Sequence, residues 1–247
     1  DENEIAVLDD GKVEFFDVHG MPVEKEMLVA DFDMEAAEKG GYAHFMLKEI
    51  HEQPTAIKTT ITPRIVDGMP NLEECGLTYD RLKGYNNIFV VACGTAMHAG
   101  LVGKYVLEKI GRIPVTVDMA SEFRYRDPII AKEDLVILVS QSGETADTLA
   151  ALRMAKERGA ETLSIVRESD MVLYTHAGPE ISVASTKAYI VQLSVFYLLS
   201  FAIAYAHGAI SKEECMRLTA ELQNVPNMLE VVLKTPDNCQ YVASQLV

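Results

Sequence analysis

Apolar and polar residues alternate in blocks along most of this chain, and the blocks predict strands followed by helices. Between the strands lie stretches with apolar residues at helical spacing, such as 96–110 and the segment that ends at Gly159. Short, continuous apolar runs are typical of strands buried on both faces. Five such runs occur, at 88–93, 113–117, 135–139, 162–166 and 172–174. Because the strands alternate with helices, we expect an α/β fold: a doubly wound, mostly parallel five-stranded sheet in a three-layer αβα arrangement.

Both ends of the chain depart from this alternation. Residues 5–8 and 13–16 are two apolar runs joined by Asp-Asp-Gly, which predicts a β-hairpin. A lone hairpin is marginal in water, so residues 1–33 are interpreted as the edge of a larger β-structure. The carboxyl-terminal part is predicted to be helical, at 185–207, at 212–223 and from Val225 onward.

The segment between these parts predicts a helix and a connector. A charged stretch with helical spacing runs from Met34 towards Ile57, and Pro54 is expected to interrupt it. His44 and His51 could share a face of this helix, but they form no complete ligand set, so no metal is expected. The Pro- and Gly-rich stretch 63–76 is interpreted as a linker or surface wrap.

Composition narrows the possible partners and the compartment. The chain has 247 residues, 49% of them hydrophobic, and a net charge of −15, which argues against nucleic acid as a partner. The longest apolar stretch, 191–206, is interrupted by Gln192 and Ser194, so it is interpreted as a buried helix and no membrane association is expected. Four cysteines are widely spaced, and the acidic start Asp-Glu-Asn-Glu is unlike a secretion signal. These features indicate a cytoplasmic protein.

The turn after the third apolar run carries the clearest chemistry. Ser140, Gln141, Ser142 and Thr145 place four neutral donors where a buried strand gives way to a helix, and no lysine or arginine lies among them. Backbone N–H groups at a helix start lack partners and favour an anion. Hydroxyl residues there are also common helix caps that need no ligand. Four of them at the ligand-binding edge of an α/β sheet favour a phosphomonoester site.

Two further stretches could complete that site. Gly94-Thr95 repeats the order of strand, glycine, hydroxyl and helix, and Cys93 before it is interpreted as a core residue. Later in the chain, the small residues Val183-Ala184-Ser185 could form a wall over a sugar, before a long helix. Glu180 and Lys187 flank this wall. They could act as a catalytic pair, although a helix cap and a helix-face charge are the simpler interpretation.

Four ordered motifs now point to a known family. They are Cys-Gly-Thr-Ala-Met-His-Ala (93–99), Ser-Glu-Phe-Arg-Tyr-Arg (121–126), Ser-Gln-Ser-Gly-Glu-Thr-Ala-Asp-Thr-Leu (140–149) and Ala-Gly-Pro-Glu-Ile-Ser-Val-Ala-Ser-Thr-Lys-Ala-Tyr (177–189). Together they resemble the first sugar-isomerase (SIS) subdomain of the isomerising glutamine–fructose-6-phosphate aminotransferases. Residues 38–54 resemble the join between the glutaminase and synthase halves of the same enzymes. The resemblance therefore divides the chain into the end of a glutaminase domain (1–33), a linker helix and connector (34–76) and an SIS domain (77–247).

The resemblance implies a function and a set of site residues. Family members convert fructose 6-phosphate and glutamine to glucosamine 6-phosphate and glutamate, at the entry to amino-sugar synthesis, and no cofactor is implied. By similarity, Ser140, Gln141, Ser142 and Thr145 hold the sugar phosphate. Thr95, Ala96, Val183 and Ser185 are expected around the ligand. Serine is frequent at position 96 in the family, and because alanine has no hydroxyl, Ala96 is expected to make only a backbone contact. SIS subdomains generally pair, which implies a homodimer.

The chain lacks parts that the family needs for catalysis. The glutaminase nucleophile and the second SIS subdomain, with its catalytic lysine and glutamate, are absent, so no catalytic residue is assigned and binding without turnover is expected. Near Val166-Arg167 the family has about eight more residues. Two alternatives stay open, a non-catalytic SIS module that senses a sugar phosphate and a fructosamine-6-phosphate deglycase. The acidic charge argues against the first and residues 1–54 against the second.

Overall fold

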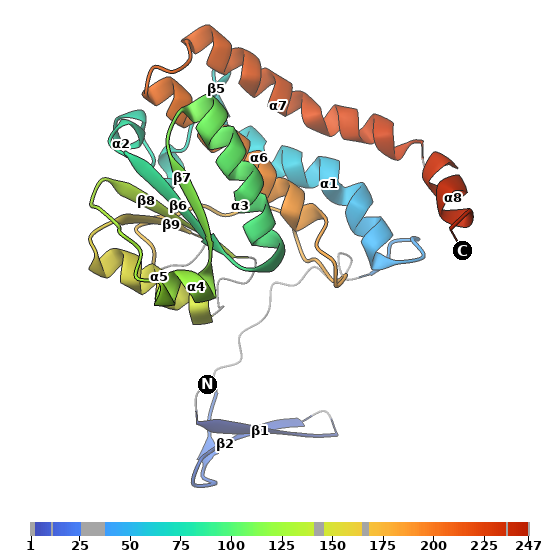
Figure 1. Cartoon of the computed structure of the whole chain (residues 1–247). Helices are drawn as coiled ribbons and strands as arrows, with labels where there is room; N and C mark the ends of the chain where they lie inside the picture. The colour runs from blue at the N-terminus through green and yellow to red at the C-terminus, as the bar shows by residue number, and fades with distance from the viewer. Residues whose placement is uncertain are drawn as a thin grey trace. The chain divides into compact units, whose positions relative to one another are not determined.

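The computed structural model describes residues 3–10, 12–25, 38–140, 146–164, 168–235 and 237–246, which form two compact units, Asp1–Glu35 and Ala36–Val247 (Figure 1). The first unit is a three-stranded antiparallel sheet of β1 (Glu4–Asp9), β2 (Lys12–Asp17) and β3 (Pro22–Val23). The predicted hairpin is confirmed, with Asp9 opposite Lys12 at its turn. Ile5, Val7 and Leu8 of β1 are exposed.

The second unit is built around a parallel five-stranded sheet, as predicted. Its strands are β6 (Asn87–Ala92), β7 (Val115–Met119), β8 (Asp134–Val139), β9 (Glu161–Ser164) and β10 (Met171–Val172), in the spatial order β10-β9-β8-β6-β7. Every neighbouring pair is parallel. Ala92 pairs with Val139, so β6 and β8 end at the same level. From β6 the chain goes first to β7 on one side and then to β8 on the other, which makes the ends of β6 and β8 the switch point of the sheet.

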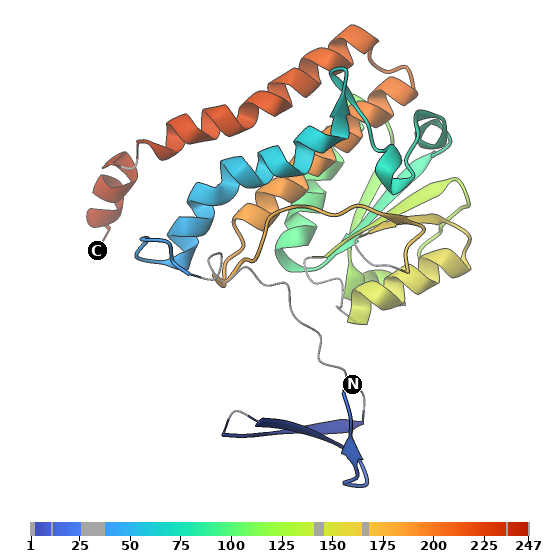
Figure 2. The same cartoon turned by 180° about the vertical axis from the view of Figure 1, so that it is seen from behind.

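Helices cover both faces of this sheet and complete the three-layer fold (Figures 1 and 2). Phe89, Val91, Val136 and Leu138 point to one face and join a core with α4 (Ala120–Tyr125) and α5 (Ala146–Glu157). The alternate residues of the same strands join the larger core on the other face. That core includes α3 (Gly94–Val106) and α6 (Lys187–Ala206), with α1 (Phe45–Ile61) and α7 (Lys212–Leu233) packed outside them. The predicted αβα arrangement is confirmed.

Close packing fixes the direction of α3 against α6. A Cβ atom added at Gly103 would lie 2.6 Å from the ring of Phe196, and one at Gly111 would lie 3.5 Å from Ile203. Gly111 ends the π-helical turn Leu107–Gly111 that continues α3. Both contacts advance along the two helices in the same sense, so α3 and α6 are parallel. Their amino-terminal ends therefore lie at the same edge of the sheet.

The predicted helix break at Pro54 and the predicted boundary between the helical segments 212–223 and 225 onward are wrong. Helix α1 contains Pro54 and α7 contains Pro226, and both helices continue through them. An interior proline costs roughly 3 kcal/mol because it removes one helical hydrogen bond and crowds the preceding turn. Both prolines are buried where α1, α6 and α7 pack together, and this tertiary packing offsets the local cost. Residues 38–44 of the predicted helix are not helical, and 34–37 lie outside the described residues.

The predicted surface wrap at 63–76 is also wrong. It folds into η1 (Thr62–Arg64), β4 (Ile65–Val66), β5 (Met69–Pro70) and η2 (Glu73–Cys75), which precede α2 (Tyr79–Lys83). Met69, Leu72 and Cys75 are buried in the larger core. Arg64 ties the segment to the sheet layer by donating to the carbonyl of Tyr174 at 2.8 Å. Residues 45–76 therefore pack in the same unit as the sheet, and the boundaries at 33/34 and 76/77 stay predictions.

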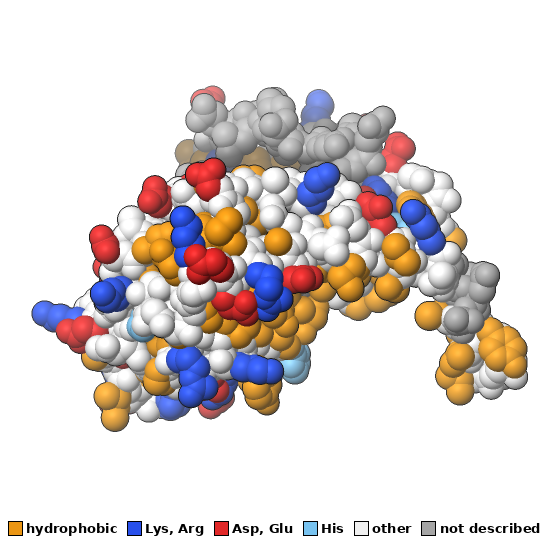
Figure 3. Space-filling model, turned by 90° about the horizontal axis from the view of Figure 1, so that it is seen from above, with side chains coloured by type: hydrophobic (Ala, Val, Ile, Leu, Met, Phe, Trp, Pro, Cys, Tyr) orange, Lys and Arg blue, Asp and Glu red, His pale blue; other side chains and the backbone are white. Residues whose placement is uncertain are grey.

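Two helices differ from the rest in their apolar character. Helix α6 is long and apolar enough to cross a membrane by length and composition, but 67% of its most apolar window is buried within the protein, as expected of a core helix. At the carboxyl end, α8 (Asp237–Ser244), at the right end of Figure 3, exposes Tyr241 and Val242. Over the rest of that view, acidic and basic side chains are interspersed.

Candidate functional site

The predicted phosphate turn begins at the switch point of the sheet, with Ser140. Ser140 directly follows β8 and is half-buried. Gln141, Ser142 and Thr145 lie outside the described residues, and α5 begins immediately after them at Ala146. A cavity of about 60 Å³ opens beside Ser140, between the ends of β8 and β9 and the first half of α6. Its polar lining comprises Ser140, Ser164, Thr175 and Gln192.

The second predicted turn leaves the start of α3 without a side-chain cap. Gly94 has φ 56°, a left-handed conformation that other residues adopt at a cost, and it turns the chain directly from β6 into α3. The capping position, Cys93, makes no side-chain hydrogen bond to the helix, and the first turn contains no acidic residue. The structure places Thr95, which is exposed, and Ala96, which is half-buried, in this first turn. Its backbone N–H groups therefore lack a capping side chain, at the same edge of the sheet as Ser140.

The third predicted stretch, residues 177–186, is here called the α6 wall because it forms no helix or strand and leads into α6. Val183 at its tip is fully exposed, and Ser185 is half-buried. Glu180 folds back over the start of α6, where its Oε1 accepts hydrogen bonds from the N–H groups of Thr186 at 2.7 Å and Ala188 at 3.2 Å. The simpler interpretation of Glu180, a helix cap, agrees with these contacts.

Lys187 forms a buried ion pair with another helix of the protein. Its ammonium group is buried, with the whole residue 3% exposed, and lies 2.6 Å from the carboxylate of Glu52 on α1. Glu52 is also 3.6 Å from Lys48, one helical turn earlier. An ion pair of this kind fixes α6 against α1. Lys187 is thus a charge on the face of α6, as in the simpler interpretation, and that face is buried against α1.

A buried carboxylate on α1 holds the α6 wall itself. Glu49 is 2% exposed, and its Oε1 accepts hydrogen bonds from the N–H groups of Ile181 at 2.5 Å and Ser182 at 3.0 Å. The Ser182 hydroxyl donates to the other oxygen of the same carboxylate. Burial alone raises the pKa of Glu49, but the hydrogen bonds from Ser182 and Ile181, with the charge of Lys187, outweigh it and lower the pKa below its ordinary value.

Sequence reasoning missed three residues near the site. Glu49 and Glu52 gave no local signal, because their partners lie more than 130 positions away in the chain. Gln192 was interpreted only as an interruption of an apolar helix. In the structure it lines the cavity, and its buried side-chain Oε1 has no hydrogen-bond partner within the described part of the chain. A polar group in an otherwise apolar helix was the available signal.

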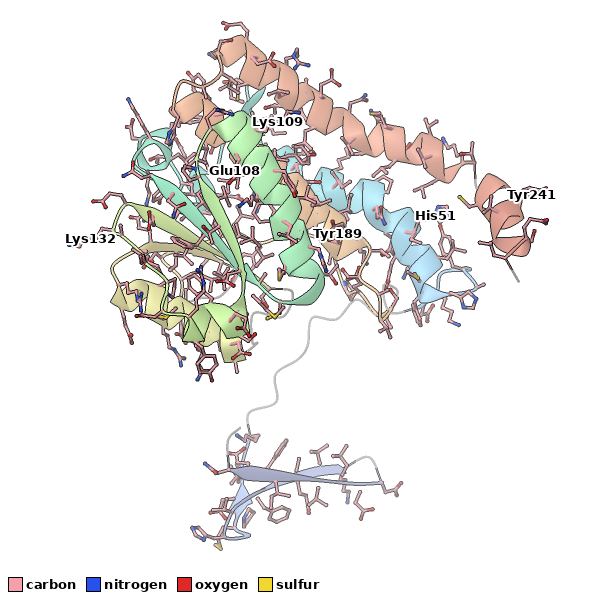
Figure 4. The ribbon with its side chains drawn as sticks, viewed as in Figure 1. His51, Glu108, Lys109, Lys132, Tyr189 and Tyr241 are labelled. Atoms are coloured by element: carbon pink, nitrogen blue, oxygen red, sulfur yellow. The ribbon has the colours of Figure 1, made fainter. Side chains whose placement is uncertain are left out.

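His51 and Cys93 are both packed against other side chains. His51, labelled in Figure 4, stacks on Tyr42 with ring centroids 5.2 Å apart. Within the described ranges, no group of three or more His, Cys, Asp or Glu side chains could hold a metal ion. Cys93 is half-buried and packs against the core on the α4–α5 face, in agreement with its interpretation as a core residue.

Comparisons with known proteins agree with the motifs. The family model described as SIS domain matches residues 81–202. A glutamine–fructose-6-phosphate aminotransferase (isomerizing) from Clostridium acetobutylicum is 50% identical over 98% of this chain, and one from Thermus thermophilus is 44% identical over 94%. Among solved structures, the C-terminal domain of the aminotransferase from Francisella tularensis superposes with a TM-score of 0.79 at 37% identity. That match covers 83% of this chain and 60% of the other.

The SIS match extends over the sheet and the candidate site, so residues 81–202 of the chain form a domain of the SIS family of α/β proteins. Within that family the chain is similar, along nearly its whole length, to the isomerising glutamine–fructose-6-phosphate aminotransferases, and the resemblance predicted from the motifs is confirmed. The chain spans about two fifths of the length of these relatives, 41% of the one from Clostridium acetobutylicum. The sensor and deglycase alternatives are not favoured.

One predicted departure from the family falls at a junction of the sheet region. The junction at Val166-Arg167, where the family has about eight more residues, lies outside the described residues.

Proposed function

We propose that this chain is the sugar-phosphate-binding part of an isomerising glutamine–fructose-6-phosphate aminotransferase and that it binds fructose 6-phosphate or glucosamine 6-phosphate. One observation carries the proposal: the uncapped start of α3 and the end of β8 meet at the switch point of the sheet. Open α/β sheets bind ligands at this position. The named relatives, which cover nearly the whole chain, supply the identity of the ligand.

The chemistry of the site suits a phosphomonoester. With a net charge of −15, the protein repels anions at long range, so capture depends on local donors. Backbone N–H groups at the starts of α3 and α5 and the side chains of Ser140, Gln141, Ser142 and Thr145 supply such donors without a formal charge. Thr95 and Ala96 lie beside the phosphate in this arrangement. Val183 and Ser185 of the α6 wall contact the sugar.

The reaction of the complete enzyme is assigned to residues beyond this chain. Conversion of fructose 6-phosphate and glutamine to glucosamine 6-phosphate and glutamate needs a source of ammonia and a positioned base for proton transfer. The two charged candidates in the α6 wall are occupied, Glu180 as a cap and Lys187 in a buried ion pair. We therefore expect ligand binding without turnover from this chain alone.

Calorimetric titration tests the binding proposal. Glucosamine 6-phosphate and fructose 6-phosphate should bind, and a nucleoside monophosphate should not. Ser142→Ala and Thr145→Ala should each weaken the affinity about tenfold, since each removes a hydrogen bond to a charged group. Ser244→Ala in α8 removes an exposed hydroxyl far along the chain and serves as the matched control. Unchanged affinity in both site variants, with only a lower melting temperature, would show that these hydroxyls are caps.

We also propose that the chain forms a homodimer through its SIS domain in the cytoplasm. Exposed apolar side chains on the outer side of α7, including Met228, Val231 and Val232, offer a surface for pairing. The four cysteines are free, as is typical of a reducing compartment. Sedimentation velocity over a range of protein concentrations tests the dimer, and a single monomeric species at all concentrations would contradict it.

A further inference from the structure

The α6 wall is held by a side chain from a helix outside the sheet layers. Both oxygens of Glu49 on α1 are used by this wall, through the N–H groups of Ile181 and Ser182 and the Ser182 hydroxyl. These donors are 132 and 133 positions away in the chain. Two segments that are far apart in the sequence therefore meet at one carboxylate.

Burying a charged group at this position costs free energy, because the group loses its contact with water. A carboxylate that is only 2% exposed has lost nearly all its hydration, and it is tolerated only when several donors replace the water. Further along α1, the buried residues Ala56, Ile57 and Ile61 belong to the hydrophobic core. An apolar residue at position 49 could fill the same space without the cost of desolvation. The carboxylate provides something that packing does not, which is a fixed loop.

The fixed loop presents exposed residues. Val183 is fully exposed and Ala184 is exposed, although both directly follow the residues that Glu49 holds. On the other side, Glu180 binds the N–H groups of Thr186 and Ala188. Residues 183–185 are thus held at both ends while the side chains of Val183 and Ala184 remain open to solvent. A free loop would lose roughly 1–2 kcal/mol of backbone entropy per residue on binding a ligand, and this arrangement removes part of that cost beforehand.

A second contact from the same face of α1 keeps the wall in register with its helix. Glu52 lies three residues after Glu49, which places both carboxylates on one side of the helix. It binds Lys187 at 2.6 Å, at the point where the wall becomes α6. Glu49 therefore fixes the loop and Glu52 fixes the helix that follows it.

We propose that Glu49 is a positioning residue for the sugar-phosphate site, whose carboxylate holds the α6 wall so that Val183 and Ser185 meet the sugar. The inference rests on the proposed function and adds to it a residue from the part of the chain that precedes the SIS match. Glu49 does not touch the ligand. It acts through Ile181 and Ser182.

Two measurements on this chain test the proposal. Glu49→Ala should weaken binding of glucosamine 6-phosphate at least about tenfold and speed hydrogen exchange at the N–H groups of Ile181 and Ser182, because a hydrogen-bonded buried charge is lost. Glu49→Gln keeps an acceptor oxygen for both N–H groups and should stay within about threefold of the original affinity. This rescue by the conservative variant separates positioning from general destabilisation.

Glu161→Ala is the matched control. Glu161 is another hydrogen-bonded carboxylate, only partly buried, and its donors are the side chains of Arg81 at 2.7 Å and Tyr85. It begins β9, at the edge of the sheet opposite the site. Its loss should lower the melting temperature and leave both the affinity and the exchange at Ile181 and Ser182 unchanged.

The outcomes separate this inference from the proposed function. Absence of sugar-phosphate binding by the unsubstituted chain would contradict the proposed function, and the exchange measurement would still test the hold on the wall. Unchanged exchange and affinity in Glu49→Ala would overturn the inference. If Glu49→Ala does not fold, Ser182→Ala removes one of the three donors and should raise exchange at Ile181. No change in Ser182→Ala would then be the overturning result.

Discussion

The amino-terminal ends of α3 and α6 lie at the same edge of the sheet, but they differ in capping. In α3 the capping residue Cys93 makes no side-chain hydrogen bond, so the first N–H groups have no partner from a capping side chain. In α6 the carboxylate of Glu180 already binds the N–H groups of Thr186 and Ala188. Both ends carry the same partial positive charge from the helix dipole. Only the first has it available for a ligand.

This difference assigns separate tasks to the two helices. A phosphate group competes poorly for an end that an internal carboxylate occupies, so in the proposed site we expect α3 and the turn before α5 to attract the anion. The α6 wall supplies shape, and its contacts with α1 determine where that shape lies. Variants that disturb one helix at a time can therefore separate attraction from shape.

The largest effect is expected from Gly103→Val, which separates the two helices. A Cβ atom at this position would lie 2.6 Å from the ring of Phe196, and the larger side chain cannot be accommodated without moving α3 away from α6. We expect a loss of about 3 kcal/mol or more in the free energy of unfolding, measured by urea denaturation. Tyr105→Val changes an exposed residue of the same helix and should alter stability by less than about 0.5 kcal/mol.

A smaller effect is expected at the turn that opens α3. Gly94 has φ 56°, and no atom lies within 4 Å of a Cβ added there, so Gly94→Val tests backbone strain without a steric clash. It should cost about 1–2 kcal/mol in unfolding free energy and weaken sugar-phosphate binding, since the first turn of α3 reorients. Asparagine tolerates this conformation, so Gly94→Asn should retain most of both. Equal losses in the two variants would show that glycine is needed for another reason.

Removing the cap of α6 should have a more modest effect. Glu180→Ala leaves the N–H groups of Thr186 and Ala188 without their acceptor and should lower the unfolding free energy by about 0.5–2 kcal/mol. Glu180→Gln keeps an acceptor oxygen and should be milder. Thermal denaturation measures both. A drop in sugar-phosphate affinity larger than the drop in stability would mean that Glu180 also contacts the ligand.

The smallest expected effect is the pH dependence of the α6 wall. The pKa of Glu49 in the folded protein lies below its ordinary value of 4.5. Near this pH the folded state therefore binds fewer protons than the unfolded chain. Ionised Glu49 stabilises the fold above pH 4.5, and this contribution is lost as the pH falls through the lowered pKa. Glu49→Gln should flatten the decline of melting temperature below pH 4.5. An identical decline in both proteins would contradict the lowered pKa.

The parts of the fold that sequence predicted depend on neighbours in the chain. The strand that ends at Val139 and the turn at Ser140 are encoded by an apolar run and the hydroxyl residues that directly follow it. The same holds for β6 and the turn at Gly94. Local conformational preference and burial agree at these positions. The pattern of an apolar run followed by turn residues was therefore sufficient to predict both the strand and the position of its turn at the edge of the sheet.

The parts that sequence did not predict depend on distant packing. Pro54 and Pro226 are locally unfavourable to a helix, and only the packing of α1, α6 and α7 explains why both helices continue. Glu49 and Glu52 resemble any two charges on a helix until the α6 wall is placed beside them. Their role requires the tertiary fold, which no single stretch of sequence contains.

The shared face of Glu49 and Glu52 also limits how this protein can be re-engineered. Each residue inserted into a helix rotates the later part of the helix by about 100° and advances it by about 1.5 Å. After an insertion in α1 between Glu49 and the buried residue Ile57, the two side chains could no longer both face the protein interior. Either the carboxylate of Glu49 or the apolar side chain of Ile57 would then point to solvent. Designers who graft a new amino-terminal module onto this chain can change residue types in that interval, but they must preserve its length.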